Sequence, residues 1–414
     1  MKTVVLDDDP TGTQSASGVK VLLHSDADLI MEALRDADSV YVQTNTRAID
    51  EQSAVDLVAK VKADAEEAAG RLGEQLQFVL RGDSTLRGHV FAETEVFLDK
   101  DAVMLFVPAF PAGGRTTVDG VHFVRVGGKE VPAHETEYAR DPVFPFATGV
   151  LAEYVLEKSG RSALPLSREI VRSDRLAQVL EAAEPGSVVI PDAENDNDIN
   201  LIAEAVVAAR GEGKRIVVRS ASPLAAALAG VASDGLLPVP LVAASRRTLL
   251  VCGSHTEGAT AQLALVRDMW GEPITVLTDA ALDDPATAGT DAADGIRSQL
   301  DERPFAYLTT ERQRQESHGT LEHGERVMSG LTHAVRAVLS QVDVIIAKGG
   351  ITSAEVARTG IGARSALVLG QVLPGISVWC MTDHTGREVL YIVVPGNVGD
   401  ERTLTDVLAA LSLP

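Results

Sequence analysis

Short apolar runs of strand type recur along this chain of 414 residues, and most are followed by a segment with helical periodicity. In the first half, strands are expected at residues 3–6, 19–24, 39–43, 77–80, 102–107, 187–191 and 215–219, and helices at 51–69, 142–158, 174–183 and 198–211. In the second half, strands are expected at 248–252, 274–277, 306–309, 343–347, 377–381 and 389–394, and helices at 256–270, 293–302, 319–340, 353–358 and 401–411. This alternation predicts an α/β fold with largely parallel sheets flanked by helices.

The length is too great for one ordinary core and suits two or three domains. The sequence GLLPVPLVAASRR, at residues 235–247, combines glycine and proline with a switch from apolar residues to two arginines. We therefore expect one domain over residues 1–240, a second over 247–414, and a ligand cleft between them. Residues 113–139 have mixed charge and weak periodicity, which predicts a β-ribbon or a loop excursion.

The formal net charge of −22 argues against nucleic acid and against an anionic membrane as partners, because both need a basic surface. A small anionic substrate remains compatible, since salt screens charges beyond about 8 Å and a local arginine cluster can override the global sign. The two cysteines, Cys252 and Cys380, lie in apolar runs and suggest no disulfide scaffold, so a cytoplasmic location is expected. The apolar stretch at residues 222–245 contains three prolines, which favours a short helix and a linker over a membrane span. No zinc motif is present, and no metal-ligand set is predicted.

Carboxylates crowd the end of the first strand, in the sequence LDDDPTGTQ at residues 6–14. Loops at the carboxyl ends of parallel strands are where ligands bind in open α/β sheets. Asp8 or Asp9 could accept the proton of an attacking hydroxyl, and such acids could also hold Mg²⁺. The alternative is a solvated turn, because Asp, Pro and Gly are turn residues.

Arginine and hydroxyl side chains follow two further strands. The sequences RGDSTLRGH and TNTRAID supply the candidate substrate-binding residues Arg47, Arg81, Asp83, Ser84, Thr85 and Arg87. Guanidinium groups bind carboxylates in bidentate fashion, and the hydroxyl groups could bind sugar hydroxyls. The alternatives are a helix capped by Ser84 or Thr85, and an ordinary cap before the helix at residue 51.

Three strand-like runs of the second half end in glycine and hydroxyl residues, in the sequences CGSHTEG, AKGGITS and VVPGNVG. Glycine lets the backbone approach an anion, so these loops are candidates for binding nucleotide phosphates. The candidate residues are Ser254, Gly349, Gly350, Ile351, Thr352, Gly396, Asn397 and Gly399. Lys348 could add positive charge or simply cap its strand. Neither a Walker A sequence, nor the protein-kinase motifs, nor a dinucleotide fingerprint is present.

Taken in order, these motifs resemble those of the four-carbon acid sugar kinases, bacterial enzymes that phosphorylate threonate, erythronate and oxo-tetronates with ATP. The resemblance covers nearly the whole chain. It is carried by Asp8-Asp9-x-Thr11-Gly12, Thr44-x-x-Arg47, Asp83-Ser84-Thr85-x-Arg87-Gly88, Gly253-Ser254 with Thr260 and Gln262, Gly349-Gly350-x-Thr352-Ser353, and Gly396-Asn397-x-Gly399. The chain departs from the family pattern at Arg81, Lys348, Ile351 and Pro395, which suggests a subgroup and leaves the substrate unassigned.

The resemblance implies an amino-terminal domain for the sugar acid and a carboxyl-terminal domain for ATP, with Mg²⁺ bridging the phosphates. Arg47, Arg81 and Arg87 would hold the substrate, and Asp8 or Asp9 would orient or deprotonate its attacking hydroxyl, expected to be the terminal O4. Two alternatives stay open: an NAD-dependent hydroxy-acid dehydrogenase, and an inactive two-lobed sugar-acid sensor. The sequence fixes neither the stereoisomer nor the oligomeric state, and a homodimer is compatible with it.

Overall fold

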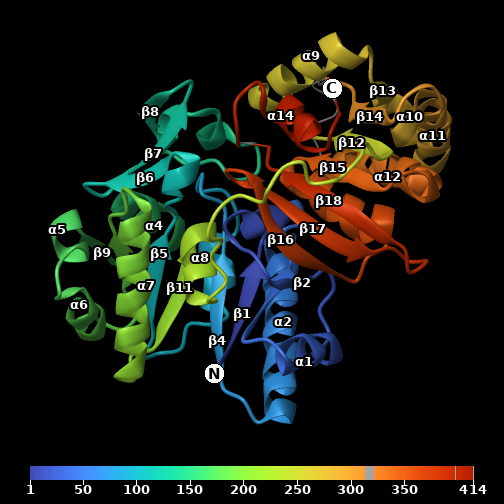
Figure 1. Ribbon diagram of the computed structural model, residues 1–414. Helices are drawn as coiled ribbons and strands as arrows, with labels where there is room; N and C mark the ends of the chain where they lie inside the picture. The colour runs from blue at the N-terminus through green and yellow to red at the C-terminus, as the bar shows by residue number, and fades with distance from the viewer. Residues whose placement is uncertain (313–320, 397, 414) are drawn as a thin grey trace. The chain divides into compact units, whose positions relative to one another are not determined.

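The computed structural model describes residues 1–312, 321–396 and 398–413, and the chain divides into two compact units, Met1–Ala232 and Ser233–Pro414. Each unit contains a run of hydrogen-bonded β-strands with helices packed on it (Figure 1). The expected α/β architecture with largely parallel sheets is confirmed.

The sheet of the first unit is entirely parallel, in the strand order β2-β3-β1-β4-β11-β5-β10-β9. Its strands are β1 (Lys2–Asp7), β2 (Lys20–Leu22), β3 (Ser39–Gln43), β4 (Leu76–Arg81), β5 (Val103–Val107), β9 (Ala163–Leu166), β10 (Val188–Pro191) and β11 (Ile216–Ser220). β1 lies between β3 and β4, and β11 follows β4. The carboxyl ends of these four strands therefore lie side by side at one edge of the sheet.

The helices of the first unit are α1 (Ala27–Arg35), α2 (Glu51–Leu72), α3 (Val90–Glu95), α4 (Leu151–Ser159), α5 (Arg168–Val171), α6 (Leu176–Ala182), α7 (Asp196–Gly211) and α8 (Ser222–Leu228). α1 and α2 cover the face of the sheet that carries Val4 and Leu6. Because side chains alternate along a strand, Val5 and Asp7 face the opposite side, where α8 contacts the 3₁₀ helix η1 (Pro10–Ser15). Asp7 thus enters the interior at the ligand-binding edge.

A small antiparallel sheet forms the ribbon expected at residues 113–139. It contains β6 (Arg115–Val118), β7 (Val121–Val126) and β8 (Lys129–Pro132). The helix expected over residues 142–158 begins only at Leu151, because Pro145 and Gly149 interrupt the segment before it. The acidic sequence DAENDND at residues 192–198 leads into the start of α7, where Asn195 and Asp198 make a capping box.

The sheet of the second unit is mixed. β13, β14, β12, β15 and β18 are parallel in that order, and β17 and β16 continue the sheet antiparallel. The strands are β12 (Thr248–Cys252), β13 (Ile274–Val276), β14 (Phe305–Thr310), β15 (Val344–Lys348), β16 (Ser365–Leu373), β17 (Ile376–Thr382) and β18 (Glu388–Val394). β16 was not expected from the sequence, because its exposed positions include Leu367 and Leu369, which blur the alternation of apolar and polar residues.

The helices of the second unit are α9 (Glu257–Trp270), α10 (Thr278–Asp283), α11 (Pro285–Glu302), α12 (Leu321–Val338), α13 (Gly350–Glu355) and α14 (Thr403–Ala410). α9 and α14 pack on one face of the sheet through Leu263, Val266 and Leu404. α11 begins eight residues before the expected residue 293, because Asp284 caps it and Pro285 occupies its first position.

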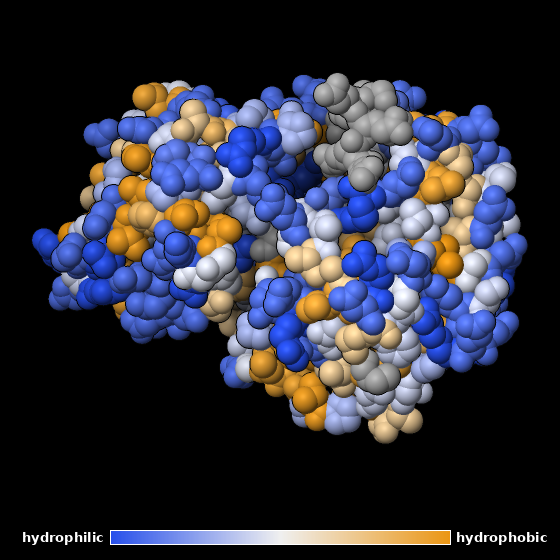
Figure 2. Space-filling model, turned by 90° about the horizontal axis from the view of Figure 1, so that it is seen from above, coloured by the Kyte–Doolittle hydropathy of each residue, from blue (hydrophilic) through white to orange (hydrophobic). Residues whose placement is uncertain are grey.

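Hydrophilic side chains dominate the face of the molecule shown in Figure 2, and hydrophobic ones occur on it in small separate groups. Among the described residues, none of the helices combines the length and the apolar character that a membrane crossing requires.

Candidate functional site

The acidic segment at the end of β1 is buried. Asp7, Asp8 and Asp9 expose 0%, 1% and 1% of their surface, so the solvated-turn alternative is wrong. Asp9 caps η1, where its Oδ1 accepts from the backbone N–H of Thr11 at 2.8 Å and from the Thr11 hydroxyl. Three acids in the interior require cations close by.

Arg81, the last residue of β4, supplies the central cation. Its Nη1 lies 3.2 Å from Asp7 Oδ1, 3.1 Å from Asp8 Oδ1 and 2.8 Å from Asp9 Oδ1. Its Nη2 donates to the Thr11 hydroxyl at 3.0 Å. Burial acts to lower the pKa of Arg81, but the Asp7 and Asp8 carboxylates outweigh it and raise that pKa. Arg81 is only 1% exposed and therefore serves to hold the three acids together.

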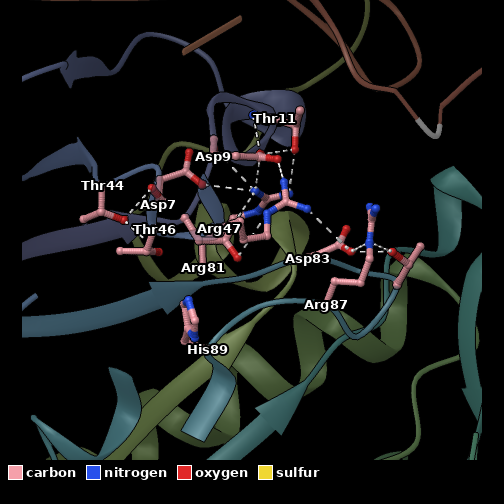
Figure 3. A network of polar contacts seen from close by, with 12 residues as sticks. Asp7, Asp9, Thr11, Thr44, Thr46, Arg47, Arg81, Asp83, Arg87 and His89 are labelled. Carbon is pink, nitrogen blue, oxygen red and sulfur yellow. Dashed lines mark hydrogen bonds and ion pairs between the residues drawn. The ribbon is translucent and has the colours of Figure 1, made fainter. Parts of the chain in front are cut away.

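Arg47 closes the cluster from the loop after β3 (Figure 3). Its guanidinium pairs with Asp9 Oδ2, lies 3.7 Å from Asp8 Oδ2, and lies 3.7 Å from Asp83 Oδ2. Burial lowers the pKa of Arg47 in spite of the neighbouring Asp8 and Asp83 carboxylates. Its side chain is 13% exposed, against 1% for those of Asp8, Asp9 and Arg81, so Arg47 forms the accessible edge of the cluster.

Asp83 joins Arg47 to Arg87. Arg87 Nε donates to Asp83 Oδ2 at 2.8 Å and to the Thr85 hydroxyl at 3.1 Å, and its guanidinium lies 5.0 Å from the ring centre of Tyr138. Burial alone would raise the pKa of Asp83, but Arg87 and Arg47 outweigh it and hold that pKa well below its usual range. Asp83 is therefore an ionised carboxylate that orients two cations.

The loop with Ser84 and Thr85 does not cap a helix, so that alternative is wrong. α3 begins later, after His89, and no side chain caps it. Ser84 is 3% exposed, and its carbonyl accepts from His122 Nε2 at 2.8 Å. The ordinary cap considered before α2 is present: Asp50 accepts from Ser53 N at 3.0 Å, whereas Arg47 lies outside this cap and belongs to the cluster.

Arg219 and Glu93 belong to the cluster and were missed in the sequence. Arg219 Nη2 lies 3.3 Å from Asp8 Oδ2, and Nη1 pairs with Glu93 Oε2. Both side chains are at most 3% exposed. A Cβ at Gly82 would lie 2.6 Å from Arg219 Nε, so this glycine makes room for the guanidinium. Arg219 could have been found in the sequence, because it ends the strand expected at residues 215–219, and strand ends of this kind lie at the ligand-binding edge.

The charges of the cluster nearly balance. Its buried core holds five carboxyl groups, of Asp7, Asp8, Asp9, Asp83 and Glu93, and four guanidinium groups, of Arg47, Arg81, Arg87 and Arg219. At its rim the more exposed Asp141 lies 3.6 Å from Arg87. Burial raises the pKa of Asp7 from 3.8 to about 7, against the opposing effect of Arg81. Its Oδ2 has no hydrogen-bond partner among the described residues. Near neutral pH Asp7 is partly protonated, which brings the cluster close to electroneutrality.

The three adjacent carboxylates do not form a good Mg²⁺ site in this state. One oxygen from each of Asp7, Asp8 and Asp9 lies within 4.8 Å of the others, a spacing that a cation could use. However, Arg81 Nη1 already contacts all three residues, and Arg47 contacts the outer oxygens of Asp8 and Asp9. The guanidinium groups occupy the place that a divalent cation would take.

The glycine-containing loops of the second unit lie together. β12, β15 and β18 are neighbours in the sheet, and their carboxyl ends carry Ser254, the Gly349–Gly350 pair and Gly396. A Cβ at Gly253 would lie 2.5 Å from Thr352 Oγ1, and one at Gly396 would lie 2.9 Å from Ser254 Oγ. The close approach of the three loops therefore requires glycine at these positions.

Three side chains of the unit's body hold the carbonyl groups of residues 395, 396 and 398, which follow β18. Lys348 Nζ donates to the carbonyl of Pro395 at 2.7 Å, Thr256 Oγ1 to that of Gly396 at 2.8 Å, and Gln262 Nε2 to that of Val398 at 3.3 Å. In the first turn of α13, Thr352 is buried and Ile351 is 44% exposed. Gly399, also after β18, has a φ of +87°, whereas the candidate Asn397 lies outside the described residues.

Comparison with known proteins identifies the family. A model described as a sugar-binding N-terminal domain matches residues 3–228, and one described as a nucleotide-binding C-terminal domain matches residues 249–404. The chain belongs to the four-carbon acid sugar kinase family. A D-threonate kinase of Salmonella typhimurium is 26% identical to this chain over 439 residues, which cover 99% of this chain and 98% of that protein.

A D-erythronate kinase of Heliobacterium modesticaldum is 30% identical over 256 residues, which cover 60% of this chain and 54% of that protein. In this match the chain spans about half the length of the relative. A Haemophilus influenzae protein of known structure superposes with a TM-score of 0.63 over 99% of both chains at 17% identity, which shows that this family member shares its fold.

Proposed function

We propose that this protein is an ATP-dependent kinase that phosphorylates a hydroxyl, the terminal O4, of a four-carbon sugar acid such as threonate, erythronate or an oxo-tetronate. The observation that carries the proposal is the convergence of three glycine-containing loops at the ends of β12, β15 and β18. A surface of backbone amides and hydroxyl groups suits the phosphates of a nucleotide, and the loops lie where the nucleotide-binding model matches.

ATP is proposed to bind as its Mg²⁺ complex to residues of these loops, namely Ser254, Gly349, Gly350, Ile351, Thr352, Gly396, Asn397 and Gly399. The metal would neutralise charge on the transferring phosphoryl group. The cluster of the first unit, saturated by guanidinium groups, is proposed to bind the acceptor molecule.

The sugar acid is proposed to bind at the accessible edge of that cluster. Arg47 and Arg87 can turn guanidinium donors towards a substrate carboxylate, and Ser84 and Thr85 lie in the loop between Asp83 and Arg87. Arg81 would contribute as a positioning residue, because its guanidinium is buried beneath the three acids.

Asp9 is favoured over Asp8 as the group that orients or deprotonates the hydroxyl. Arg47 contacts Oδ2 of both acids, but Oδ2 of Asp8 also has Arg219 at 3.3 Å. If Arg47 turns to the substrate carboxylate, Asp9 Oδ2 becomes free to accept from a hydroxyl, while Asp8 stays paired. Asp8 then serves mainly to hold Arg81 and Arg219 in place.

The test is ADP release in a coupled assay with both stereoisomers of threonate and erythronate and with their oxo forms. Asp9→Asn should lower kcat by about a hundredfold or more, the usual contribution of a positioned proton acceptor. Asp268→Asn, at a side chain that is 66% exposed, is the matched control and should retain full activity.

Three results would contradict the proposal. Sugar-acid binding without ADP release would favour the sensor. Reduction of NAD by a hydroxy acid would favour the dehydrogenase. Full activity of both Asp8→Asn and Asp9→Asn would remove these residues from the mechanism.

A further inference from the structure

A buried lysine lies directly beneath the glycine-containing loops of the second unit. Lys348 is the last residue of β15, is fully buried, and immediately precedes Gly349. It is the only lysine in residues 233–414. An ammonium group has three donors, and among the described residues the Pro395 carbonyl is the one acceptor within hydrogen-bond distance of Lys348 Nζ, at 2.7 Å.

Hydrogen bonds to residues 395, 396 and 398, after β18, determine which way the backbone carbonyl groups of these residues face. The carbonyls of Pro395, Gly396 and Val398 each accept from a side chain of the unit's body. In a trans peptide the N–H of the next residue points opposite to the carbonyl. The amides of Gly396 and Gly399 therefore point away from the body, and they have no hydrogen-bond acceptor within the described part of the chain.

The environment of Lys348 offers little negative charge. Its strand neighbours in register are Cys252 on β12 and Val394 on β18. Arg312 is a second cation nearby, because it donates to the carbonyl of Ser254 and acts on Cys252. A buried ammonium without a carboxylate is costly, and an anion at the loops above it would offset that cost.

We propose that Lys348 is a positioning residue for nucleotide binding, which holds the Pro395 carbonyl so that the loop amides face the phosphates and which supplies the buried positive charge beneath them. This inference rests on the proposed function, because it assumes that the loops bind a nucleotide. Binding of the anion and protonation of Lys348 then favour each other.

Proton linkage follows from the burial of this lysine. Burial lowers the pKa of Lys348 to about 8, whereas burial raises the pKa of Cys252, so Lys348 is the group that changes charge first as the pH rises. A bound polyphosphate stabilises the charged form and raises the pKa of Lys348. By reciprocity, a rise of about one unit means that the protonated protein binds the nucleotide about tenfold more tightly.

The experiment uses the full chain with ADP as the probe. Lysine labelled with carbon-13 reports the protonation of Lys348 by NMR, and Lys348→Arg identifies its resonance by its loss. The pH midpoint of the Lys348 titration should rise by about one pH unit when ADP is added. In parallel, calorimetry should show the dissociation constant of ADP rising about tenfold from pH 7.5 to pH 10.

The variants separate charge from packing. Lys348→Met should bind ADP about tenfold more weakly at pH 7.5 and should lose the pH dependence, while Lys348→Arg should keep tight binding at high pH. Lys129→Met, at an exposed lysine of β8, is the control and should match the wild type. Fluorescence of Trp270 and Trp379 checks that the second unit is folded in each variant.

The outcomes distinguish this inference from the proposed function. ADP binding that leaves the titration midpoint of Lys348 unchanged would refute the role of Lys348. The same holds if Lys348→Met keeps the wild-type affinity for ADP and its pH dependence. In both cases the kinase proposal stands. If neither ADP nor ATP binds to the wild type, the nucleotide assignment fails and the role of Lys348 fails with it.

Discussion

Removal of the Arg219 guanidinium tests whether the buried charges of the first unit depend on one another. Arg219→Met removes the ion-pair partner of Glu93 and takes from Asp8 one of its three cations. Breaking a buried ion pair by removing one partner typically costs about 3–5 kcal/mol, because the other charge stays buried. With a urea slope of about 3 kcal/mol/M, the unfolding midpoint should fall by about 1–1.7 M.

The two units can be followed separately during this experiment. Both tryptophans, Trp270 and Trp379, lie in the second unit, so their fluorescence reports its unfolding. Far-UV circular dichroism reports both units. In Arg219→Met the circular dichroism signal should gain an early transition that the tryptophan signal lacks.

A second substitution checks the cause. Glu93→Gln in the Arg219→Met background removes the stranded charge, so the double variant should be more stable than Arg219→Met alone. A midpoint for Arg219→Met within about 0.2 M of the wild type would refute the reasoning, because it would show that Glu93 and Asp8 do not need this cation.

Two further predictions concern Asp7 and the glycine-containing loops. Because burial raises the pKa of Asp7 from 3.8 to about 7, the folded chain keeps a proton that the unfolded chain releases near pH 4. The wild type should lose up to about 4 kcal/mol of stability from this group as the pH rises from about 4 to 7, and urea unfolding of Asp7→Asn should lack that loss. Gly253→Ala places a Cβ 2.5 Å from Thr352 Oγ1 and should weaken ADP binding in calorimetry, whereas Gly258→Ala, whose Cβ meets nothing within 4 Å, should bind as the wild type does. If Gly253→Ala and Gly258→Ala bound ADP with equal affinity, the close contact between Gly253 and Thr352 would not be needed for binding, and this prediction would be wrong.

The strand-end rule explains how much of the site could be predicted. Asp9, Arg81 and Thr352 all follow or end strands that the apolar pattern marks, so their shared edge could be expected. Glu93 lies inside a helix and Arg219 inside a strand, where a charge usually means a solvated face. Only the packing of α3 on β11 brings the two together, and single-sequence patterns carry no such information.

The role of Arg81 could not be foreseen for a related reason. An arginine beside Asp83 in a glycine-containing loop suggests a substrate contact, and nothing in the sequence signals that the guanidinium turns inward. Its direction follows from the register of β1 and β4, which places Asp7 opposite Arg81. Lys348 had two open interpretations, charge donor or cap of its own strand, and its bond to Pro395 shows that it reaches instead to the segment after the neighbouring strand β18.

The arrangement of Arg47 constrains how a substrate can reach the acids. Arg47 is the most exposed of the three cations that touch Asp8 or Asp9, so under the proposed function an incoming carboxylate would meet it first. If Arg47 exchanged its partner Asp9 for a substrate carboxylate, it would still have one ion-pair partner. The exchange would therefore cost little electrostatic energy. Asp9 Oδ2 would then regain a partner only when a hydroxyl of the same molecule reaches it, while Oδ1 keeps Arg81 and Thr11. A molecule with a carboxylate but no hydroxyl within reach would leave Asp9 Oδ2 without that partner, so under the proposed function we expect the cluster to prefer hydroxy acids over simple carboxylic acids.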